Sequence, residues 1–189
     1  MVSQDFPVTN GVRQGSVNSP IYFCVYMDDL LRQCRKKGTG CYLGNIYAAI
    51  FGYADDLLLC SPSIQGLQDL IDTASSYADS HAIAFSTDDN PNKSKTKAMI
   101  LSTSAKQKNP APIMLNGRRL PWVKSAKYLG CLWSARNDGH QSDMNQKRGI
   151  FVSNNHTMMQ EFPLAHPEVK TKLIRVYNSS FYGYGIWDL

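Results

Sequence analysis

The chain has 189 residues, of which 43% are apolar and 19% are charged, as in globular proteins and unlike disordered ones. No stretch reaches the ~18 uncharged apolar residues that a membrane-spanning helix needs. The net charge of +5 conceals a basic C-terminal half, because residues 93–189 carry 15 basic and five acidic residues, and this excess suits either a polyanionic partner or a solvated lysine surface.

The five cysteines and the first residues narrow the class of protein further. An odd number of cysteines with no Cys-x-x-Cys pair argues against a disulfide framework and against a zinc knuckle. The opening MVSQDFPVTN has neither the basic nor the apolar region of a signal peptide. We therefore expect an intracellular protein, nuclear or cytoplasmic and not secreted.

The first predicted element is a glycine-rich loop that leads into a helix. In GVRQGSVNSP, two glycines bracket Arg13 and Gln14, and glycine lets a backbone approach a ligand closely. Ser19 and Pro20 predict the N-cap and the first position of a helix, whose free N–H groups can bind a phosphate or a base-pair edge. The following IYFCVYMDDLLRQCRKK is apolar almost all round at its start, so we expect a buried helix that ends at Gly38.

Two apolar runs then predict a β-hairpin. NIYAAIFGY, residues 45–53, and LLLC, residues 57–60, have the length and composition of strands, and Ala54, Asp55 and Asp56 lie between them. The Ser-Pro pair that follows predicts the start of an amphipathic helix, because apolar residues recur at spacings of three and four. These apolar positions are Ile64, Leu67, Leu70, Ile71, Ala74 and Ala78.

The second half of the chain predicts a turn, short strands and two helical segments. STDDNPNKS has the composition of a turn, and TKAMILST, residues 96–103, that of a strand. PIMLNGRRL predicts a hairpin around its Asn-Gly pair, and AKYLGCLWS predicts a second with its turn at Gly130. From Gln141 onward the pattern is helical, with a break between Phe162 and Pro167.

Two Asp-Asp pairs are candidates for metal-dependent chemistry, and the first of them suits a surface role better. Asp28 and Asp29 lie within the first predicted helix, about 100° apart around its axis. Arg32 follows Asp28 by four residues, a spacing that suits an ion pair along the helix. We interpret this pair as a solvated patch.

The second pair, Asp55 and Asp56, suits a metal site. Two adjacent carboxylates at a hairpin tip repel each other, and no Lys or Arg occurs between Lys37 and Lys93 to neutralise them. A divalent cation would do so, since Mg²⁺ takes oxygen ligands and phosphates complete its shell. Two such ions about 4 Å apart can activate a 3′-hydroxyl and stabilise a leaving pyrophosphate. A polar turn that happens to be Asp-Asp is the alternative.

The order of these motifs resembles a reverse transcriptase of the non-LTR retrotransposon type over essentially the whole chain. GVRQGSVNSPIYF resembles the family's loop and helix after the first catalytic strand, and FGYADD resembles its catalytic hairpin. NPNKSKTKAMIL resembles the lysine-bearing turn and strand, and KYLGCLW resembles the primer-grip hairpin. The resemblance implies RNA-directed DNA polymerase activity by two-metal nucleotidyl transfer, with an RNA template, a DNA primer and dNTPs as partners.

The resemblance also implies a role for individual residues near the chemistry. Asp55 would be a principal ligand of Mg²⁺ or Mn²⁺, and Asp56 its neighbour in the same site. Arg13, Gln14 and Gly15 would line the template and the nascent base pair. The first Asp-Asp pair belongs to the tetrad Tyr26-Met27-Asp28-Asp29 and the second to Tyr53-Ala54-Asp55-Asp56. In the non-LTR pattern, the first tetrad falls mid-helix and is not catalytic.

Two further motifs would contact the substrates. Lys95 best matches the lysine near the incoming triphosphate, although the Lys-Ser-Lys-Thr-Lys run leaves Lys93 and Lys97 as alternatives. Tyr128, Leu129 and Gly130 would form the primer grip.

The implied fold is α+β, a partial right-hand polymerase palm with an antiparallel sheet and helices on one face, plus a C-terminal helical segment. We expect a palm in residues 1–125, a primer-grip-like hairpin in 126–140, and the start of a helical thumb in 141–189.

The sequence departs from the family upstream of the glycine-rich loop. Two-metal catalysis needs carboxylates from separate strands, and the family supplies one from a strand tens of residues before the loop. Only ten residues precede Gly11, and Asp5 is too close to the loop for that role. We therefore expect a fragment that lacks the fingers and the upstream aspartate, carries no endonuclease or RNase H segment, and is inactive alone.

Two other interpretations stay open. A non-catalytic remnant would bind nucleic acid through its basic half and the aromatic residues Trp122, Tyr128 and Trp133, although aromatic side chains more often form core. A degenerate product without function would expose apolar strand edges and aggregate.

Overall fold

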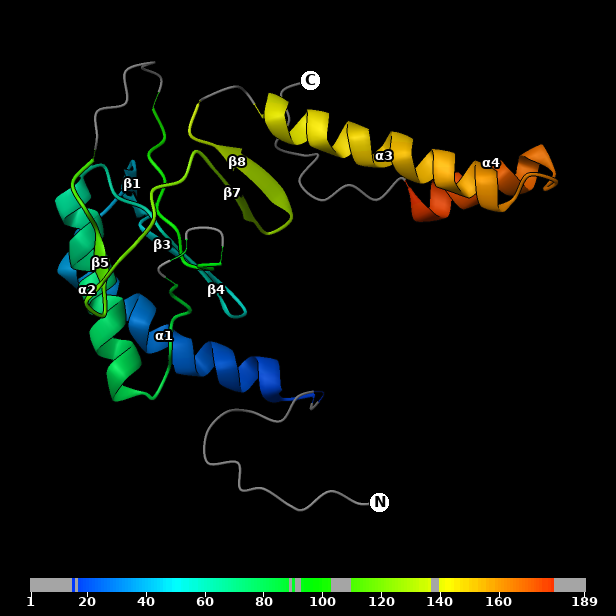
Figure 1. Cartoon of the computed structure of the whole chain (residues 1–189). Helices are drawn as coiled ribbons and strands as arrows, with labels where there is room; N and C mark the ends of the chain where they lie inside the picture. Colours follow the sequence, from blue (N-terminus) through cyan, green and yellow to red (C-terminus); the bar gives the residue numbers. More distant parts are fainter. Residues whose placement is uncertain are drawn as a thin grey trace. The chain divides into compact units, whose positions relative to one another are not determined.

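The computed structural model in Figure 1 describes residues 15, 17–88, 90, 93–102, 110–136 and 140–178. The chain divides into two compact units, the first made of Met1–Thr96 with Asn109–Leu120 and the second of Lys97–Lys108 with Pro121–Leu189. Each unit combines helices with two-stranded antiparallel sheets, which confirms the mixed α+β class at that coarse level. Among the described residues, no helix has both the length and the apolar character needed to cross a membrane.

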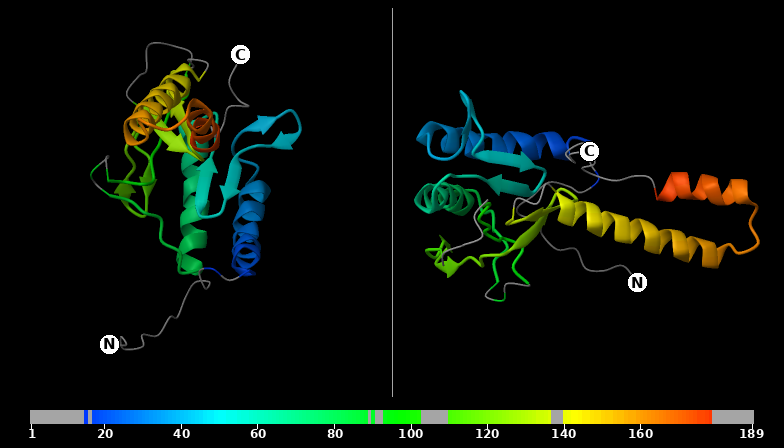
Figure 2. Two further views of the ribbon diagram at one scale, coloured as in Figure 1. Left: turned by 90° about the vertical axis from the view of Figure 1, so that its right-hand side faces the viewer. Right: turned by 90° about the horizontal axis from the view of Figure 1, so that it is seen from above.

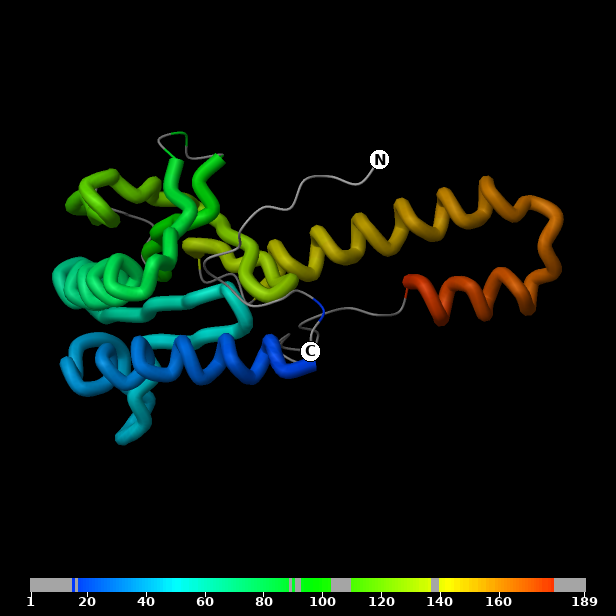
Figure 3. Tube along the Cα trace, turned by 90° about the horizontal axis from the view of Figure 1, so that it is seen from below, coloured from blue at the N-terminus to red at the C-terminus, as the bar shows by residue number. Residues whose placement is uncertain are grey.

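Helices α1 (Ser19–Lys37) and α2 (Ile64–Ser80) lie side by side and enclose the core of the first unit (Figure 3). The buried core residues come from both helices and from the base of a hairpin: Leu30, Cys34, Ala49, Leu70, Ala74 and Tyr77. Burial of each large apolar side chain contributes roughly 1.5–3 kcal/mol. The contact between the two helices is therefore a principal source of stability in this unit.

The N-terminal cap of α1 differs by one residue from the prediction. Asn18 is the N-cap, so Ser19 and Pro20 occupy the first two helical positions. Asn18 makes no side-chain capping hydrogen bond, and proline, which lacks an N–H group, removes one donor that would otherwise need a partner.

The expectation that α1 is buried from its start is wrong. Ile21, Tyr22 and Val25 are 59–69% exposed. The packing contacts of α1 with the core involve Met27 and Leu30, later in the helix. The first turns of α1 are therefore apolar in sequence but exposed in this structure.

The C-terminal end of α1 is fixed by Gly38, as predicted, and by Tyr47. Gly38 has a φ of 67°, and its N–H donates to the Arg35 carbonyl at 3.1 Å. The Tyr47 hydroxyl lies 2.9 Å from the carbonyl oxygen of Cys34 and 2.8 Å from that of Thr39. Burial raises the pKa of Tyr47 to about 12, so its hydroxyl stays protonated and able to donate even at alkaline pH.

Helix α2 begins two residues later than the Ser61-Pro62 pair suggested. The Ser63 hydroxyl accepts a hydrogen bond from the Gly66 N–H at 3.1 Å and caps the helix. The predicted apolar stripe is confirmed in its central part, because Leu70, Ile71, Ala74 and Ala78 are buried.

The apolar run at 45–53 is divided between two hairpins (Figure 2). Strand β1 (Tyr42–Leu43) pairs with β2 (Ile46–Tyr47), and β3 (Ile50–Tyr53) pairs with β4 (Asp56–Leu59). The division falls between Ala48, whose N–H donates to the Cys41 carbonyl, and Ala49, whose carbonyl accepts from the Cys60 N–H. Because β3 contacts α1 and β4 contacts α2, the second hairpin is held by both helices.

A third hairpin, β5 (Met114–Leu115) with β6 (Arg118–Arg119), forms around Asn116-Gly117 as predicted. Both turn residues have positive φ, 50° and 73°, as a type I′ hairpin turn requires. The Gln68 side-chain amide of α2 donates to the Met114 carbonyl and accepts from its N–H, both at 2.8 Å. The amide thus takes the place of a neighbouring strand and fixes the hairpin to α2.

The second unit contains a fourth hairpin and two helices. Strand β7 (Ser125–Tyr128) pairs with β8 (Cys131–Ser134), and α3 (Gln141–Glu161) is followed after the predicted break by α4 (Pro167–Tyr177). The predicted strand at 96–103 is not formed in its described residues. Ala98 and Ser102 make only isolated parallel bridges, with Trp122 and Arg136, so no continuous ladder is present there.

Among the described residues, the strands form four separate two-stranded sheets. The antiparallel sheet expected from the sequence is therefore present only as hairpins. Two of these hairpins carry the residues predicted to act on substrate.

Candidate functional site

The β3–β4 hairpin places Asp55 and Asp56 at a tight turn. Tyr53 pairs with Asp56, so Ala54 and Asp55 form a two-residue turn and Asp56 begins β4. This corrects the expectation that all three residues from Ala54 to Asp56 lie between the strands. Ala54 has a φ of 49°, a left-handed conformation that costs a residue with a Cβ about 1–2 kcal/mol.

The hairpin is anchored at one end and open at the other. At its base, the Cys60 N–H donates to the Ala49 carbonyl at 2.7 Å, and Ile50, Leu57 and Leu59 pack against the core of the first unit. At its tip, Asp55 and Asp56 are exposed to solvent. The two carboxylates are therefore held by a fixed backbone and accessible from outside.

The donor set of this tip fits part of a hard-metal site. Two adjacent carboxylates supply oxygen atoms, the ligands that Mg²⁺ and Mn²⁺ prefer. In the part of the chain that the structure describes, no group of three or more His, Cys, Asp or Glu side chains comes together around a common point. Asp55 and Asp56 could thus hold a divalent ion only with further ligands from water, from phosphate or from other carboxylates.

The first Asp-Asp pair has a different environment on α1. Arg32 Nη2 lies 2.8 Å from Asp28 Oδ2, which confirms the predicted ion pair. The ion pair is exposed, with side-chain exposures of 70% for Arg32 and 50% for Asp28. Asp29 is also exposed on the helix surface. This pair therefore lies on a helix surface and not at a turn.

The tyrosine of that first tetrad belongs to the contact between α1 and α2. The Tyr26 hydroxyl donates to the His81 carbonyl at 2.6 Å, and the Tyr26 carbonyl accepts from the Tyr77 hydroxyl. The His81 ring stacks on Tyr77 and meets Tyr26 edge-on, with ring centroids 3.8 and 5.3 Å apart. Burial, with the nearby charge of Asp29 second, raises the pKa of Tyr77. Tyr26 thus has a structural role that the sequence did not reveal.

The glycine-rich loop is described only in part. Arg13 and Gln14, predicted to line the template, lie outside the described residues. Gly15 is exposed and has a φ of 79°, and a Cβ added there would meet no atom within 4 Å. The left-handed backbone therefore favours glycine at this position.

The lysine run presents all three of its lysines to solvent. Lys93, Lys95 and Lys97 are exposed, while Ser94 between them is only 2% exposed. The Ser94 hydroxyl donates to the Thr96 carbonyl at 2.7 Å and fixes the local turn. The structure does not distinguish the three lysines by burial, so Lys95 stays the prediction that the family pattern favours.

The predicted primer-grip residues form the turn of the β7–β8 hairpin. Tyr128 pairs with Cys131, and Leu129 and Gly130 have φ values of 47° and 81°. Leucine seldom adopts a left-handed conformation, because its Cβ crowds the following carbonyl. Leu129 and Ala54 thus hold strained positions at the two turns predicted to be functional, whereas Asn116 and Gly117 hold the turn of the β5–β6 hairpin.

A buried ion pair, missed from the sequence, ties the β7–β8 hairpin to α3. Asp143 is 1% exposed and Lys147 8% exposed, with Lys147 Nζ 2.8 Å from Asp143 Oδ2. The other carboxylate oxygen of Asp143 accepts from the Leu132 N–H of β8 at 2.8 Å. The four-residue spacing of Asp and Lys in the first turns of a helix was the available signal, but such pairs are usually solvated.

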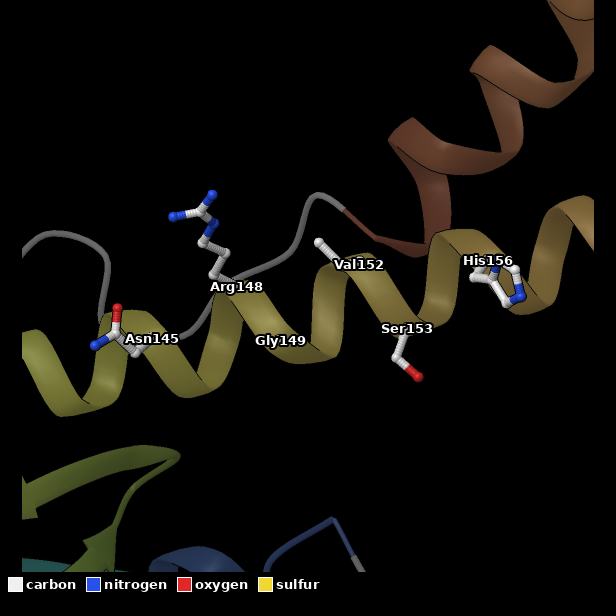
Figure 4. A pocket seen from close by; sticks show the side chains of 6 residues that line it. All are labelled: Asn145, Arg148, Gly149, Val152, Ser153 and His156. Atoms are coloured by element: carbon white, nitrogen blue, oxygen red, sulfur yellow. The ribbon is translucent and has the colours of Figure 1, made fainter.

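A shallow groove of about 570 Å³ runs along one face of α3 (Figure 4). Residues at helical spacings of three and four line it: Asn145, Arg148, Gly149, Val152, Ser153 and His156. None of them was predicted as a site residue. Arg148 gives the groove a fixed positive charge, and Gly149 leaves one helical turn without a side chain.

Comparison with known proteins places this geometry in context. Residues 2–132 match the family model described as reverse transcriptase (RNA-dependent DNA polymerase). The matched segment includes the β3–β4 hairpin, which carries Asp55 and Asp56, and the turn of the β7–β8 hairpin.

Two curated proteins of Drosophila melanogaster are similar in sequence. The retrovirus-related Pol polyprotein from type-2 retrotransposable element R2DM is 40% identical over 70 residues, which cover 37% of this chain and 6% of that protein. A 115 kDa protein in type-1 retrotransposable element R1DM is 31% identical over 134 residues, which cover 67% of this chain and 11% of that protein. The chain thus spans about a tenth or less of the length of these relatives. No solved structure matches the chain.

Proposed function

The chain belongs to the reverse transcriptase family, of the kind found in non-LTR retrotransposons, and on that premise we propose that Asp55 and Asp56 are metal-binding carboxylates of its polymerase site. The observation that carries the proposal is their placement, exposed and adjacent, at the tip of a hairpin whose base is packed into a core. Such a hairpin holds the two carboxylates in a fixed position, and a fixed position of the ligand atoms favours the binding of a metal ion in a defined geometry.

The metal would be Mg²⁺ or Mn²⁺. When bound, such ions activate a primer 3′-hydroxyl and stabilise the leaving pyrophosphate. Asp55 and Asp56 would hold and orient the ion through oxygen atoms fixed by the turn. Phosphate oxygens of the incoming nucleotide are suitable further ligands.

Other residues would position the nucleic acids and the nucleotide. Gly15, together with Arg13 and Gln14, would line the RNA template and the nascent base pair. An exposed lysine of the 93–97 run, Lys95 by the family pattern, would neutralise the triphosphate. The β7–β8 turn at Tyr128, Leu129 and Gly130 would hold the DNA primer, and the strained φ of Leu129 supports a functional constraint there.

We propose a palm in residues 1–125, a primer-grip hairpin in 126–140 and the start of a thumb in 141–189. The separate α3–α4 helical segment supports the last of these assignments. The first two are supported by the positions of the β3–β4 and β7–β8 hairpins in the family match.

The 189 residues alone would not extend a primer. Two-metal catalysis needs carboxylates from separate strands, and no third potential ligand joins Asp55 and Asp56 among the described residues. The relatives are far longer than this chain, which supports a role within a larger polypeptide. The remaining ligand and the rest of the substrate site would come from that polypeptide.

Primer extension on poly(rA)·oligo(dT) tests both parts of this proposal. The 189-residue chain and a longer reverse transcriptase in which it replaces the matching segment are assayed side by side, with Mg²⁺ and with a chelator. We expect synthesis by the longer protein only, and loss of synthesis with the chelator. Metal-dependent synthesis by the chain alone would refute its inactivity, and an inert but folded longer protein would refute the polymerase assignment.

Nucleic-acid binding without synthesis is the second candidate function. The α3 groove, which Arg148 lines, and the basic residues Lys170, Lys172 and Arg175 of α4 favour contact with phosphates. The affinity of the 189-residue chain for an RNA–DNA duplex would then fall steeply with salt concentration. Removal of one phosphate contact by Arg148→Gln should reduce the salt slope by about 1.

A further inference from the structure

Cys41 and Cys60 lie beside each other at the bases of two hairpins. The Cys41 N–H donates to the Cys60 carbonyl at 3.1 Å. Each cysteine also continues the pairing of its own hairpin, since Ala48 N–H donates to the Cys41 carbonyl at 2.9 Å and Cys60 N–H to the Ala49 carbonyl at 2.7 Å. A direct backbone hydrogen bond limits the separation of the two Cα atoms to about 7 Å, near the range of about 4.4–6.8 Å that a disulfide spans.

Gly40 is the reason that the two cysteines can come so close. Its φ of 120° is a backbone conformation that residues with a Cβ rarely adopt. An added Cβ would also lie only 2.2 Å from the Ala49 Cβ and 3.0 Å from the Cys60 carbonyl oxygen. A side chain at position 40 would therefore push the 39–41 segment away from the base of the β3–β4 hairpin.

The two cysteines are neighbours in the backbone hydrogen-bond network and are partly exposed to solvent. Burial raises the pKa of Cys60, and the charge of the Cys41 thiolate raises it further. Both residues are half-buried, whereas Cys34 is fully buried. All five cysteines lie in the described part of the chain, and none of them forms a disulfide in this structure.

From this geometry we infer that Cys41 and Cys60 form a reversible disulfide that responds to oxidation. The bond would close residues 42–59 into a loop, and both Asp55 and Asp56 lie inside it. It would add a covalent link at the end of the β3–β4 hairpin opposite to the carboxylates. The pair thus forms a modification site distinct from the proposed polymerase chemistry, and it does not depend on that function.

The oxidant would be a low-molecular-weight disulfide such as oxidised glutathione. The Cys41 thiolate attacks one sulfur of glutathione disulfide, and a glutathione thiolate leaves and takes up the proton that Cys41 lost. The Cys60 thiolate then attacks the sulfur of Cys41, and the second glutathione leaves as a thiolate that takes up the proton from Cys60. Two protein thiols are oxidised and one glutathione disulfide is reduced to two thiols. Because the pKa of Cys60 is raised, the second step should accelerate as the pH rises.

The sequence makes the product easy to identify. No Lys or Arg lies between Lys37 and Lys93, so trypsin releases residues 38–93 as one peptide, with Cys41 and Cys60 as its only cysteines. The folded 189-residue chain is treated with oxidised glutathione, remaining thiols are alkylated, and the peptide is weighed. We expect it to lose the mass of two hydrogen atoms and to carry no alkyl group. Chymotrypsin, which cleaves between the two cysteines, should then give two peptides joined by a bond that dithiothreitol breaks.

Variants separate this disulfide from general thiol oxidation. Cys60→Ser should abolish the internal bond and leave Cys41 as a glutathione adduct, whereas Cys24→Ser, which removes an exposed cysteine of α1, should leave the bond intact. The inference is overturned if peptide 38–93 of the folded wild-type chain carries two glutathiones or two alkyl groups. It is also overturned if the bond forms only after the chain is denatured.

Discussion

The two Asp-Asp pairs of this chain have nearly the same neighbours in sequence and different surroundings in space. Residues 26–29 lie within α1, where Tyr26 bridges to α2 and Asp28 pairs with Arg32. Residues 53–56 span the β3–β4 turn, where Tyr53 is 66% exposed and both carboxylates face solvent. Residues 26–29 are therefore suited to a structural role in joining and stabilising helices. Residues 53–56, whose carboxylates are exposed at a fixed turn, are suited to ligand binding.

The sharpest test of this comparison is the loss of synthesis when one aspartate of each pair is replaced. In the longer reverse transcriptase, Asp55→Ala should lower the rate of primer extension by about a thousandfold, or about 4 kcal/mol, because a metal contributes several kcal/mol to such reactions. Asp28→Ala should leave most of the rate. Single-turnover primer extension with saturating Mg²⁺ measures both. If the folded Asp28→Ala enzyme is equally inert, the assignment of the two pairs is wrong.

A fifth aspartate, Asp143, is buried and lies outside both pairs, and it has the most clearly structural role of the five. Asp143→Ala should destabilise the 189-residue chain by about 3 kcal/mol, because it leaves Lys147 charged in a buried position and the Leu132 N–H without its acceptor. Chemical denaturation monitored by circular dichroism measures this loss. Glu161→Ala, at an exposed position of the same helix, is the matched control and should change stability by less than about 0.5 kcal/mol.

The partner of Asp143 can be removed at the same time to identify the cause. In Asp143→Ala/Lys147→Met, the buried ammonium charge is removed as well, so the double variant should be more stable than Asp143→Ala alone. A double variant that is less stable would show that the ion pair is not what Asp143 contributes.

Local sequence signals predicted several elements of the fold correctly. The Asn116-Gly117 turn, the Gly38 helix end and the spacing of Leu70, Ile71 and Ala74 are local signals, and the structure confirms the elements that they predicted. The roles of Asp55, Asp56 and Lys95 stay predictions, because exposure alone does not identify what a side chain binds.

The features that the sequence could not predict are tertiary contacts between elements. The apolar start of α1 predicted burial, but whether a neighbour covers a helix face is not encoded in that face, and Ile21 and Val25 are exposed. The run at 96–103 has the composition of a strand, but a strand needs a partner, and the described residues offer Ala98 only a single bridge. The bonds between Gln68 and Met114 join residues 46 positions apart, for which no local pattern exists.

The tyrosines of the two tetrads should differ by a smaller but measurable amount. Tyr26→Phe removes the hydrogen bond to the His81 carbonyl and should cost about 1 kcal/mol of unfolding free energy. Tyr53→Phe, at an exposed hairpin position, should cost less than about 0.5 kcal/mol. Equal effects in urea denaturation of the two variants would mean that Tyr26 does not help to join α1 to α2.

The smallest expected effect concerns the ion pair of Asp28 with Arg32. Because both side chains are at least half exposed, their coupling should be only about 0.3 kcal/mol, and it should vanish in molar salt. A single Asp28→Ala substitution would hide this value, since alanine itself favours a helix by a similar amount. A double-mutant cycle with Asp28→Ala and Arg32→Ala isolates the coupling from helix propensity. A coupling above about 1 kcal/mol that persists in high salt would show a carboxylate held by more than a surface contact, and Asp28 would then resemble Asp143 rather than a solvated helix residue.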